Sequence, residues 1–333
     1  MAMRVLEHMS TSITFARARR RDHVTRALVV LSLGLLLVPV LAACGKKVDD
    51  SAISGREIRV VATTGMVADV ARAVGGDRVD VDALMGPGID PHLYKPTASD
   101  VDALDDADIV FYNGLHLEGR MTEIFERLSR SKPAVAIADN LPQDRLREPP
   151  EFEGKFDPHV WFDVDLWSHT VESVRAALAD LDPTHAADYA ARADAYVAEL
   201  AELDSWVRAE IQKIPEQNRV LITAHDAFGY FGVAYGLEVR GLQGISTASE
   251  AGAADVQALA EYITERQIPA IFIESSVNEA TIDAVKEAVR SRGFDVQIGG
   301  RLYSDAMGES GTPDGTYLGM VRANVATIVG ALS

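Results

Sequence analysis

One long helical pattern in the middle of the chain constrains the fold more than any other feature. Residues 184–214, between Pro183 and Pro215, contain no Gly or Pro, and apolar residues recur there at spacings of three and four. The pattern predicts one helix of about 28 residues, roughly 40 Å long at 1.5 Å per residue. Its apolar positions are Ala190, Ala193, Val197, Leu200, Leu203, Val207 and Ile211. Such a helix would be a stiff connector that suppresses wide hinge motion.

Short apolar runs, rich in β-branched residues, lie on both sides of this pattern and alternate with amphipathic helical stretches. The runs are Ile58–Thr63, Val79–Leu84, Ile109–Asn113, Ala134–Ala138, Val220–Ala224, Glu238–Leu242, Ala270–Glu274 and Asp295–Ile298. The helical stretches include Met66–Val74, Thr97–Ala107, Thr247–Arg266 and Glu279–Arg292. This alternation predicts an α/β fold of two lobes, 58–183 and 215–333, each with a mostly parallel four-stranded sheet flanked by helices. The long helix over 184–214 would join them.

Residues 1–43 have the pattern of an export signal. Five arginines over residues 17–26 precede an apolar run from Ala27 to Ala43, which ends in Leu41-Ala42-Ala43-Cys44. Because Cys44 is the only cysteine and follows the small residues directly, we expect a lipoprotein signal, with lipid on Cys44 after cleavage. The apolar run is short for a membrane span of about 20 residues, although a single transmembrane anchor or a plain secretory signal stays possible. Export by either the general or the twin-arginine route fits the sequence.

The expected mature chain would lie in the cell envelope, on the outer face of the cytoplasmic membrane or in the periplasm. Residues 44–57 are polar and lack periodicity, as a flexible tether would be. Without residues 1–43 the chain has 26 Lys and Arg against 48 Asp and Glu, a net charge of about −22. That charge argues against nucleic acid as a partner. With Cys44 acylated no disulfide can form, so stability must come from the hydrophobic core.

Four residues spread over the chain are candidate metal ligands. His92 and His159 each follow an Asp-Pro pair, and a proline restricts the backbone that presents the imidazole. His225 directly follows the run Val220–Ala224, and Asp305 follows the last run by a short loop. Because ligands of parallel α/β lobes bind at the carboxyl ends of the strands, we expect two of these residues on each lobe, facing across a cleft.

Three imidazoles and one carboxylate suit Zn(II), Mn(II) or Fe(II) and suit Ca(II) or Mg(II) poorly. Four protein ligands leave little room for a reactive water, which favours capture of the ion over catalysis. Each imidazole needs an acceptor at its second nitrogen. The candidates are Asp157, Asp163, Asp226 and Glu250.

Other polar and aromatic residues are expected to have structural roles. His169 and His185 fall in helical or helix-capping surroundings, whereas His116 follows a strand and could lie near the site. Trp161 and Phe162 are expected to pack beside the cleft. Glu274, at the end of an apolar run, is expected to be a buried hydrogen-bonding residue rather than a fifth ligand.

Several segments together resemble the metal-binding solute-binding lipoproteins of ABC importers, the zinc and manganese group, and most closely its TroA-like members. The similarity extends from about Ile58 to the C-terminus and is carried by Asp90-Pro91-His92, Asn113-Gly114-Leu115-His116-Leu117-Glu118, Asp157-Pro158-His159-Val160-Trp161, residues 223–231, residues 272–276 and residues 304–308. The resemblance implies two α/β lobes joined by one long helix, with the metal held between them and delivered to a membrane permease. By position, the family's four ligands correspond to His92, His159, His225 and Asp305.

Two departures bear on the choice of metal. Many zinc-dedicated relatives have a His- and Asp-rich loop between the first two ligands, and the corresponding stretch here, residues 140–156, has no histidine. Many manganese-dedicated relatives have Glu as the third ligand, where this chain has His225. A nitrogen-rich site would bind zinc more tightly than manganese.

The sequence therefore predicts a monomeric, non-enzymatic, lipid-anchored receptor that captures Zn(II) or Mn(II), with Fe(II) also possible, and delivers it to an ABC permease and its ATPase. No metal is expected as a catalyst. One alternative is a metalloenzyme with a three-His, one-Asp Mn or Fe site, which would need an open coordination position and a general acid or base. Another is a binding protein for chelates such as a siderophore or corrinoid, which would show a wide cleft and no protein ligands to the metal.

Overall fold

The computed structural model describes residues 53, 55–152 and 154–333, and these residues belong to one compact unit. The expected signal segment over 1–43, the lipidation site Cys44 and nearly all of the tether lie outside the described residues. In the described part of the chain, no helix is both long enough and apolar enough to span a bilayer.

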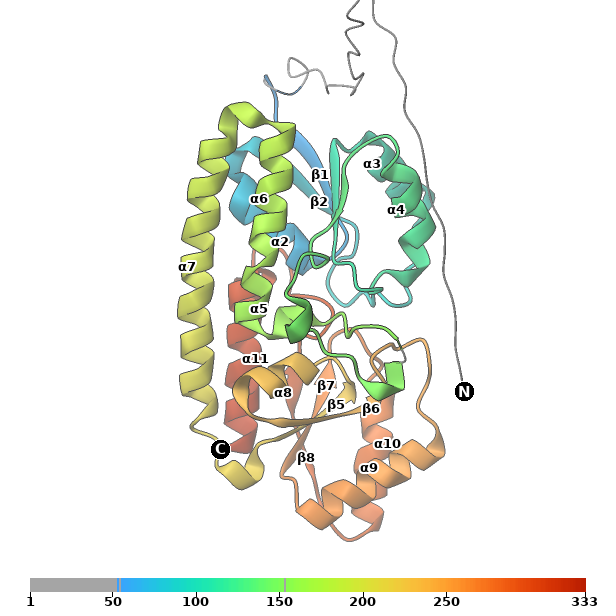
Figure 1. Ribbon diagram of the computed structural model, residues 1–333. Coiled ribbons are helices and arrows are strands. Elements are labelled where there is room, and N and C mark those ends of the chain that lie inside the picture. The colour runs from blue at the N-terminus through green and yellow to red at the C-terminus, as the bar shows by residue number, and fades with distance from the viewer. Residues whose placement is uncertain (1–52, 54, 153) are drawn as a thin grey trace, which may run out of the picture. The chain divides into compact units, whose positions relative to one another are not determined.

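The N-terminal part contains the four-stranded parallel sheet that the sequence predicts. Its strands are ordered β2-β1-β3-β4, with bounds Val79–Ala83, Ile58–Ala62, Ile109–Tyr112 and Ala134–Ala136. Successive residues of β1 face opposite sides, because side chains alternate along a strand. Val60 packs in the same cluster as helix α2 (Gly65–Gly75), whereas Val61 packs with residues of α3 (Ala98–Asp106) and α4 (Thr122–Leu128). Helices therefore cover both faces of this sheet (Figure 1).

Local capping explains where two of these helices begin. The hydroxyl of Thr64 accepts a hydrogen bond from the backbone N–H of Val67 and starts α2. Thr97 and Asp100 form a reciprocal capping box that starts α3. The loop between β2 and α3 thus has fixed ends, and it carries His92.

Helix α7 (Ala186–Ile211) is the long helix that the sequence predicts over 184–214, and it has 26 residues. A 3-10 turn, Pro183–His185, precedes it. The predicted apolar face is largely confirmed: Ala193, Leu200, Leu203, Val207 and Ile211 are buried. Ala190 is only half-buried and Val197 is exposed, and the tyrosines at 189 and 196 fill those places in the core. In Figure 1 α7 lies along α6 (Thr170–Leu181), with α5 (Val164–Ser168) and α11 (Tyr317–Leu332) at its side.

The C-terminal part differs from the predicted single four-stranded sheet. It has two parallel two-stranded sheets, β5-β6 (Val220–His225, Glu238–Gln243) and β7-β8 (Ala270–Glu274, Gln297–Leu302). Strands β5 and β7 lie side by side, but the backbone N–H of His225 donates to the side chain of Glu274 at 2.9 Å rather than to a carbonyl of β7. The remaining helices are α8 (Gly229–Tyr235), α9 (Ala253–Arg266), α10 (Ala280–Ser291) and α11.

One hydrophobic cluster runs through both parts of the chain. It joins the first sheet and α2 with α7, and it continues to Phe272 of β7 and to Tyr317 of α11. Phe162 stacks on Phe228 with ring centroids 4.1 Å apart, which ties the segment after β4 to the start of α8. This continuous packing holds together the loops that carry the candidate ligands.

Candidate metal centre

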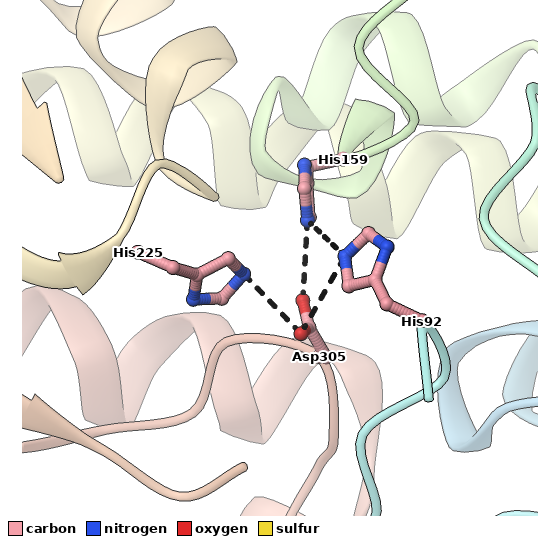
Figure 2. A group of neighbouring side chains, drawn as sticks. All are labelled: His92, His159, His225 and Asp305. Atoms are coloured by element: carbon pink, nitrogen blue, oxygen red, sulfur yellow. Dashed lines mark hydrogen bonds and ion pairs between the residues drawn. The ribbon is translucent and has the colours of Figure 1, made fainter. Parts of the chain in front are cut away.

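The four candidate ligands meet at one point (Figure 2). One donor atom from each of His92, His159, His225 and Asp305 lies within 4.8 Å of all the others. The Nε2 atoms of His92 and His159 are 3.2 Å apart, and the carboxylate of Asp305 lies 3.9, 3.3 and 3.2 Å from Nε2 of His92, His159 and His225. Tetrahedral zinc with bonds of about 2.1 Å places its ligand atoms about 3.4 Å apart, so these spacings fit such an ion.

Each candidate ligand lies either at the end of a strand or in a loop. His225 is the last residue of β5, and Asp305 comes three residues after β8 ends at Leu302. His92 lies in the loop between β2 and α3, and His159 directly precedes a 3-10 turn, Val160–Phe162. Two donors thus come from segments before α7 and two from segments after it.

The centre is buried, and part of it lacks hydrogen bonds. His159 and His225 are fully buried, Asp305 is 1% exposed and His92 is 7% exposed. Nε2 of His225 and Oδ1 of Asp305 have no hydrogen-bond partner among the described residues. Buried polar atoms normally have hydrogen-bond partners, so metal-ligating atoms that converge at ion-pair distances without forming such bonds indicate a place for a cation.

His159 is held by Asp157, which is itself held by an arginine. Oδ1 of Asp157 accepts the backbone N–H of His159 at 3.0 Å and lies 2.7 Å from its Nδ1. The other oxygen of Asp157 contacts the guanidinium of Arg147. The hydroxyl of Tyr230 accepts the backbone N–H of Arg147 and donates to the carbonyl of Asp157, both at 3.0 Å. A Cβ at Gly229 would overlap the Arg147 guanidinium, so a larger residue at the start of α8 would displace this arginine.

His225 is held by Glu274 at the end of the neighbouring strand β7. Oε1 of Glu274 accepts the backbone N–H of His225 at 2.9 Å, and Oε2 lies 2.5 Å from Nδ1. Glu274 is fully buried. As with Asp157, a carboxylate at Nδ1 fixes the imidazole so that Nε2 points to the centre.

His92 is held through its backbone rather than its ring. Oδ1 of Asp90 accepts the backbone N–H of His92 at 2.8 Å. Oδ2 of Asp90 accepts the hydroxyl of Thr247 at 2.6 Å, from the loop between β6 and α9. Within the described residues, the structure records no hydrogen bond at Nδ1 of His92.

The charges of the centre are unequal. Burial lowers the pKa of His92 to about 3. Burial also acts to lower the pKa of His159, but its contacts with Asp157 and Asp305 outweigh this effect and raise it to about 9. Against the same effect of burial, Glu274 and Asp305 raise the pKa of His225 well above its ordinary value. Burial acts to raise the pKa of Asp305, but His225 and His159 hold it well below the ordinary value.

Most of the other expected roles can be compared with the structure. Among the four suggested orienting acids, Asp157 contacts a ligand ring, whereas Asp163 caps α5 through Leu166 and binds Arg145. Asp226 donates its backbone N–H to the carbonyl of Gln243, and Glu250 lines a neighbouring cavity.

The three remaining described histidines lie away from the ligand cluster. His116 lines a separate cavity with Tyr112 and Asp139, His169 caps the end of α5, and His185 contacts Asp182. Trp161 packs edge-on against the His159 ring and donates its indole N–H to the carbonyl of Ser304, next to Asp305.

Sequence reasoning missed three residues that hold the ligands. Thr247 is far in sequence from His92, and Arg147 lies 10 positions before Asp157, but no local motif marks either residue. Ser276 lies 3.5 Å from Oδ2 of Asp305 and 2.8 Å from the hydroxyl of Ser304. The role of Glu274 could be predicted from the sequence, because a carboxylate that ends an apolar run is expected to be buried beside a hydrogen-bond partner.

Comparison with known proteins agrees with this arrangement. Residues 60–331 match the family described as zinc-uptake complex component A, periplasmic (ZnuA). The chain is 50% identical over 304 residues to the zinc-binding protein TroA of Treponema pallidum (strain Nichols), covering 91% of this chain and 97% of TroA. It is 49% identical over 295 residues to the manganese-binding lipoprotein MntA of Bacillus subtilis (strain 168), covering 88% of this chain and 95% of MntA.

Solved structures share the fold. The periplasmic zinc-binding protein TroA from Treponema pallidum superposes with a TM-score of 0.81 at 50% identity, over 83% of this chain and 99% of that chain. The Mn-bound periplasmic metal-binding protein from Candidatus Liberibacter asiaticus superposes with a TM-score of 0.73 at 23% identity, over 83% of this chain and 100% of that chain. At 23% identity the second likeness concerns the fold alone.

Proposed function

Because the chain belongs to the family of periplasmic zinc-uptake components, the TroA-like metal-binding proteins of ABC importers, we propose that it captures a divalent transition metal outside the cytoplasm. The family is one of transport components, and the chain is a binding protein rather than an enzyme. The metal is its cargo, which it gives up to the permease and ATPase of an importer.

The metal ligands in this proposal are His92, His159, His225 and Asp305. The observation that carries it is the convergence of three Nε2 atoms and one carboxylate at 3.2–3.9 Å in a buried place where two of the donor atoms have no hydrogen-bond partner. Asp157 and Glu274 fix two of the imidazoles in the orientation that a metal needs.

Zinc is the cargo that the donor set favours, with manganese bound more weakly and Fe(II) acceptable. A site with three nitrogen donors and one oxygen donor is expected to bind Zn(II) more tightly than Fe(II) or Mn(II). The two relatives at 50% and 49% identity are named for zinc and for manganese respectively, so likeness alone does not separate the two metals.

The chain's organisation in this proposal follows from its sequence and its long helix. A signal over 1–43 directs export, lipid on Cys44 anchors the chain, and residues 44–57 form a tether. The segments 58–183 and 215–333 act as two lobes, α7 and its flanks over 184–214 act as a stiff connector, and the protein works as a monomer. Relatives named as lipoproteins support the anchor.

The two alternative functions fit the site less well. A redox or hydrolytic metalloenzyme needs an open coordination position beside an acid or base, whereas here four donors surround one point. A binding protein for chelates needs room for a large ligand, whereas the donors here are 0–7% exposed and close together.

Metal stoichiometry tests the proposal. The metal-free full-length protein should bind one Zn(II) per chain in a calorimetric titration, and Mn(II) more weakly in competition. The double variant His225→Ala/Asp305→Ala should bind none. A control with the same residue types, His169→Ala/Asp295→Ala, changes exposed positions and should bind one ion. Full stoichiometry in the first double variant would refute the ligand assignment.

A further inference from the structure

A cavity of about 390 Å³ lies beside the centre on the side of His92. Its walls include Asp90 and Leu93 from the loop after β2, and Gln243, Thr247, Glu250 and Ser276 from the C-terminal part. Asp90 binds the backbone of His92, and Ser276 contacts the carboxylate of Asp305. The cavity therefore borders two of the four ligands through residues that touch them.

The burial of the ligands indicates which side is open to solvent. His92 is 7% exposed, whereas the other three ligands are at most 1% exposed. Trp161 packs edge-on against His159, and Glu274 contacts Nδ1 of His225. Solvent therefore reaches the centre past His92, where the cavity lies.

The cavity has the size and the polarity for a hydrated divalent cation. Six waters at about 30 Å³ each occupy about 180 Å³, well below the cavity volume. The walls offer the carboxylates of Asp90 and Glu250, and Oε1 of Gln243 is buried without a hydrogen-bond partner among the described residues. Oxygen atoms of this kind would accept hydrogen bonds from the water shell of a hydrated cation.

Among the described residues, one hydrogen bond joins the His92 loop to the C-terminal part, and it lies at this cavity. The hydroxyl of Thr247 donates to Oδ2 of Asp90 at 2.6 Å, while Oδ1 of Asp90 accepts the N–H of His92. Thr247 is 7% exposed. Both partners belong to loops outside helices and strands, one between β2 and α3 and the other between β6 and α9. Breaking this bond therefore frees a loop without disrupting a helix or a sheet.

A second contact brings the same loop close to the C-terminal part. Gly88 has φ +73°, and a Cβ built on it would lie 3.3 Å from the carbonyl oxygen of Ser275, next to Ser276. A larger residue at 88 would be strained and would push the loop outward. The His92 loop thus lies close against the other wall, with one hydrogen bond to hold it there.

From these observations we propose that the cavity is the route by which a hydrated divalent cation reaches the centre, and that the Asp90–Thr247 hydrogen bond is a clasp that closes this route. The inference rests on the proposed function, since it assumes that the four ligands bind a metal. In the closed form, Asp90 fixes the His92 backbone at the bonding position. In the open form, the loop moves with His92, and the ion exchanges with solvent.

Exchange kinetics of the full-length protein with Zn(II) test the clasp. Thr247→Val keeps the shape of the side chain and removes the donor. Because a hydrogen bond to a charged group is lost, loading from solution and release to a chromophoric chelator should both become about tenfold faster in stopped flow. The dissociation constant at equilibrium should change less than either rate. Thr264→Val is the control, since the Thr264 hydroxyl bonds within α9 and is remote from the cavity.

Hydrogen exchange of the metal-free protein gives a second readout. Backbone amides over residues 84–97 should exchange faster in Thr247→Val than in Thr264→Val, and the melting temperatures of the two variants should differ by no more than about 4 °C. Unchanged rates in Thr247→Val, in a parent protein that binds one Zn(II), would overturn the clasp. Faster release with unchanged loading would also overturn it, because Thr247 would then only position a ligand. A parent protein that binds no Zn(II) would instead refute the proposed function.

Discussion

The two histidines with carboxylate partners are held in different ways. His159 lies in an irregular segment, and a single oxygen of Asp157 serves both its backbone N–H and its Nδ1, which leaves the other oxygen for Arg147. His225 ends a buried strand, and Glu274 uses one oxygen for the backbone N–H and the other for Nδ1. In the described part of the chain, the structure pairs Glu274 with His225 and with no Lys or Arg.

The difference shows what each kind of backbone requires. A strand fixes the backbone of His225 through its ladder, so one carboxylate on the neighbouring strand completes the orientation. An irregular segment has no ladder, so His159 depends on Asp157, Arg147 and Tyr230 together. The same chemical task therefore takes one supporting side chain in a sheet and three in a loop.

The largest difference in zinc affinity between the two pairs should appear when each carboxylate is replaced by its amide. Glu274→Gln retains one acceptor oxygen where two are used, so either the backbone N–H or Nδ1 of His225 loses its partner. Asp157→Asn retains the one oxygen that serves His159. We expect zinc affinity to fall about 100-fold in Glu274→Gln and about tenfold in Asp157→Asn, within the usual range for residues that orient metal ligands. Competition with a chelator of known affinity measures both.

Stability should show the opposite order. Asp157→Asn places an amide against the Arg147 guanidinium and removes the counter-charge of this arginine. The melting temperature should therefore fall further in Asp157→Asn than in Glu274→Gln. Equal losses of affinity in the two variants would mean that the different use of the oxygens has no functional consequence.

The pH dependence of zinc binding should reflect the two histidine–carboxylate pairs, His159 with Asp157 and His225 with Glu274. A metal needs the Nε2 lone pair, and contacts with Asp157 and Asp305 raise the pKa of His159 to about 9, so a proton competes below that pH. Zinc affinity should therefore rise with pH up to about 9, by about tenfold per unit for each proton displaced. Calorimetry in buffers of different ionisation enthalpy counts the protons released. A pH-independent affinity between 6 and 8 would contradict these pKa directions.

A smaller effect is expected at Arg147. Arg147→Met keeps most of the side-chain volume but leaves Asp157 without its cation, which should cost about 2 kcal/mol of unfolding free energy. Zinc affinity should fall only a few-fold, because Asp157 still holds His159. Arg145→Met is the matched control, since Arg145 pairs with Asp163 and Asp165 away from the centre. An affinity loss as large as that of Asp157→Asn would show that Arg147 acts directly on the site.

Local pattern predicted much of the fold. The spacing of apolar residues predicted α7, and alternation predicted parallel sheets with helices on both faces. Local pattern did not predict every buried position of α7, because burial also depends on what the helix packs against. Tyr196 rather than Val197 faces the core. A tyrosine can bury its ring while its hydroxyl donates to Asp69, here at 2.8 Å. The division of the C-terminal strands into two sheets was not predicted either, and the contact between β5 and β7 through His225 and Glu274 joins residues 49 positions apart.

The candidate ligands could be chosen from sequence because each follows a strand or an Asp-Pro turn. Their supporting residues could not be chosen in the same way. Thr247 lies 157 positions from Asp90, and Tyr230 lies 83 positions from Arg147, so only the folded chain brings these partners together.

X-ray absorption spectroscopy of the Zn(II)-loaded full-length protein identifies the metal ligands directly. We expect four nitrogen and oxygen neighbours at about 2.0–2.1 Å, with scattering from three imidazole rings. A sulfur neighbour at about 2.3 Å, or a shell of oxygen atoms without imidazole scattering, would contradict the assignment of His92, His159, His225 and Asp305 as the metal ligands.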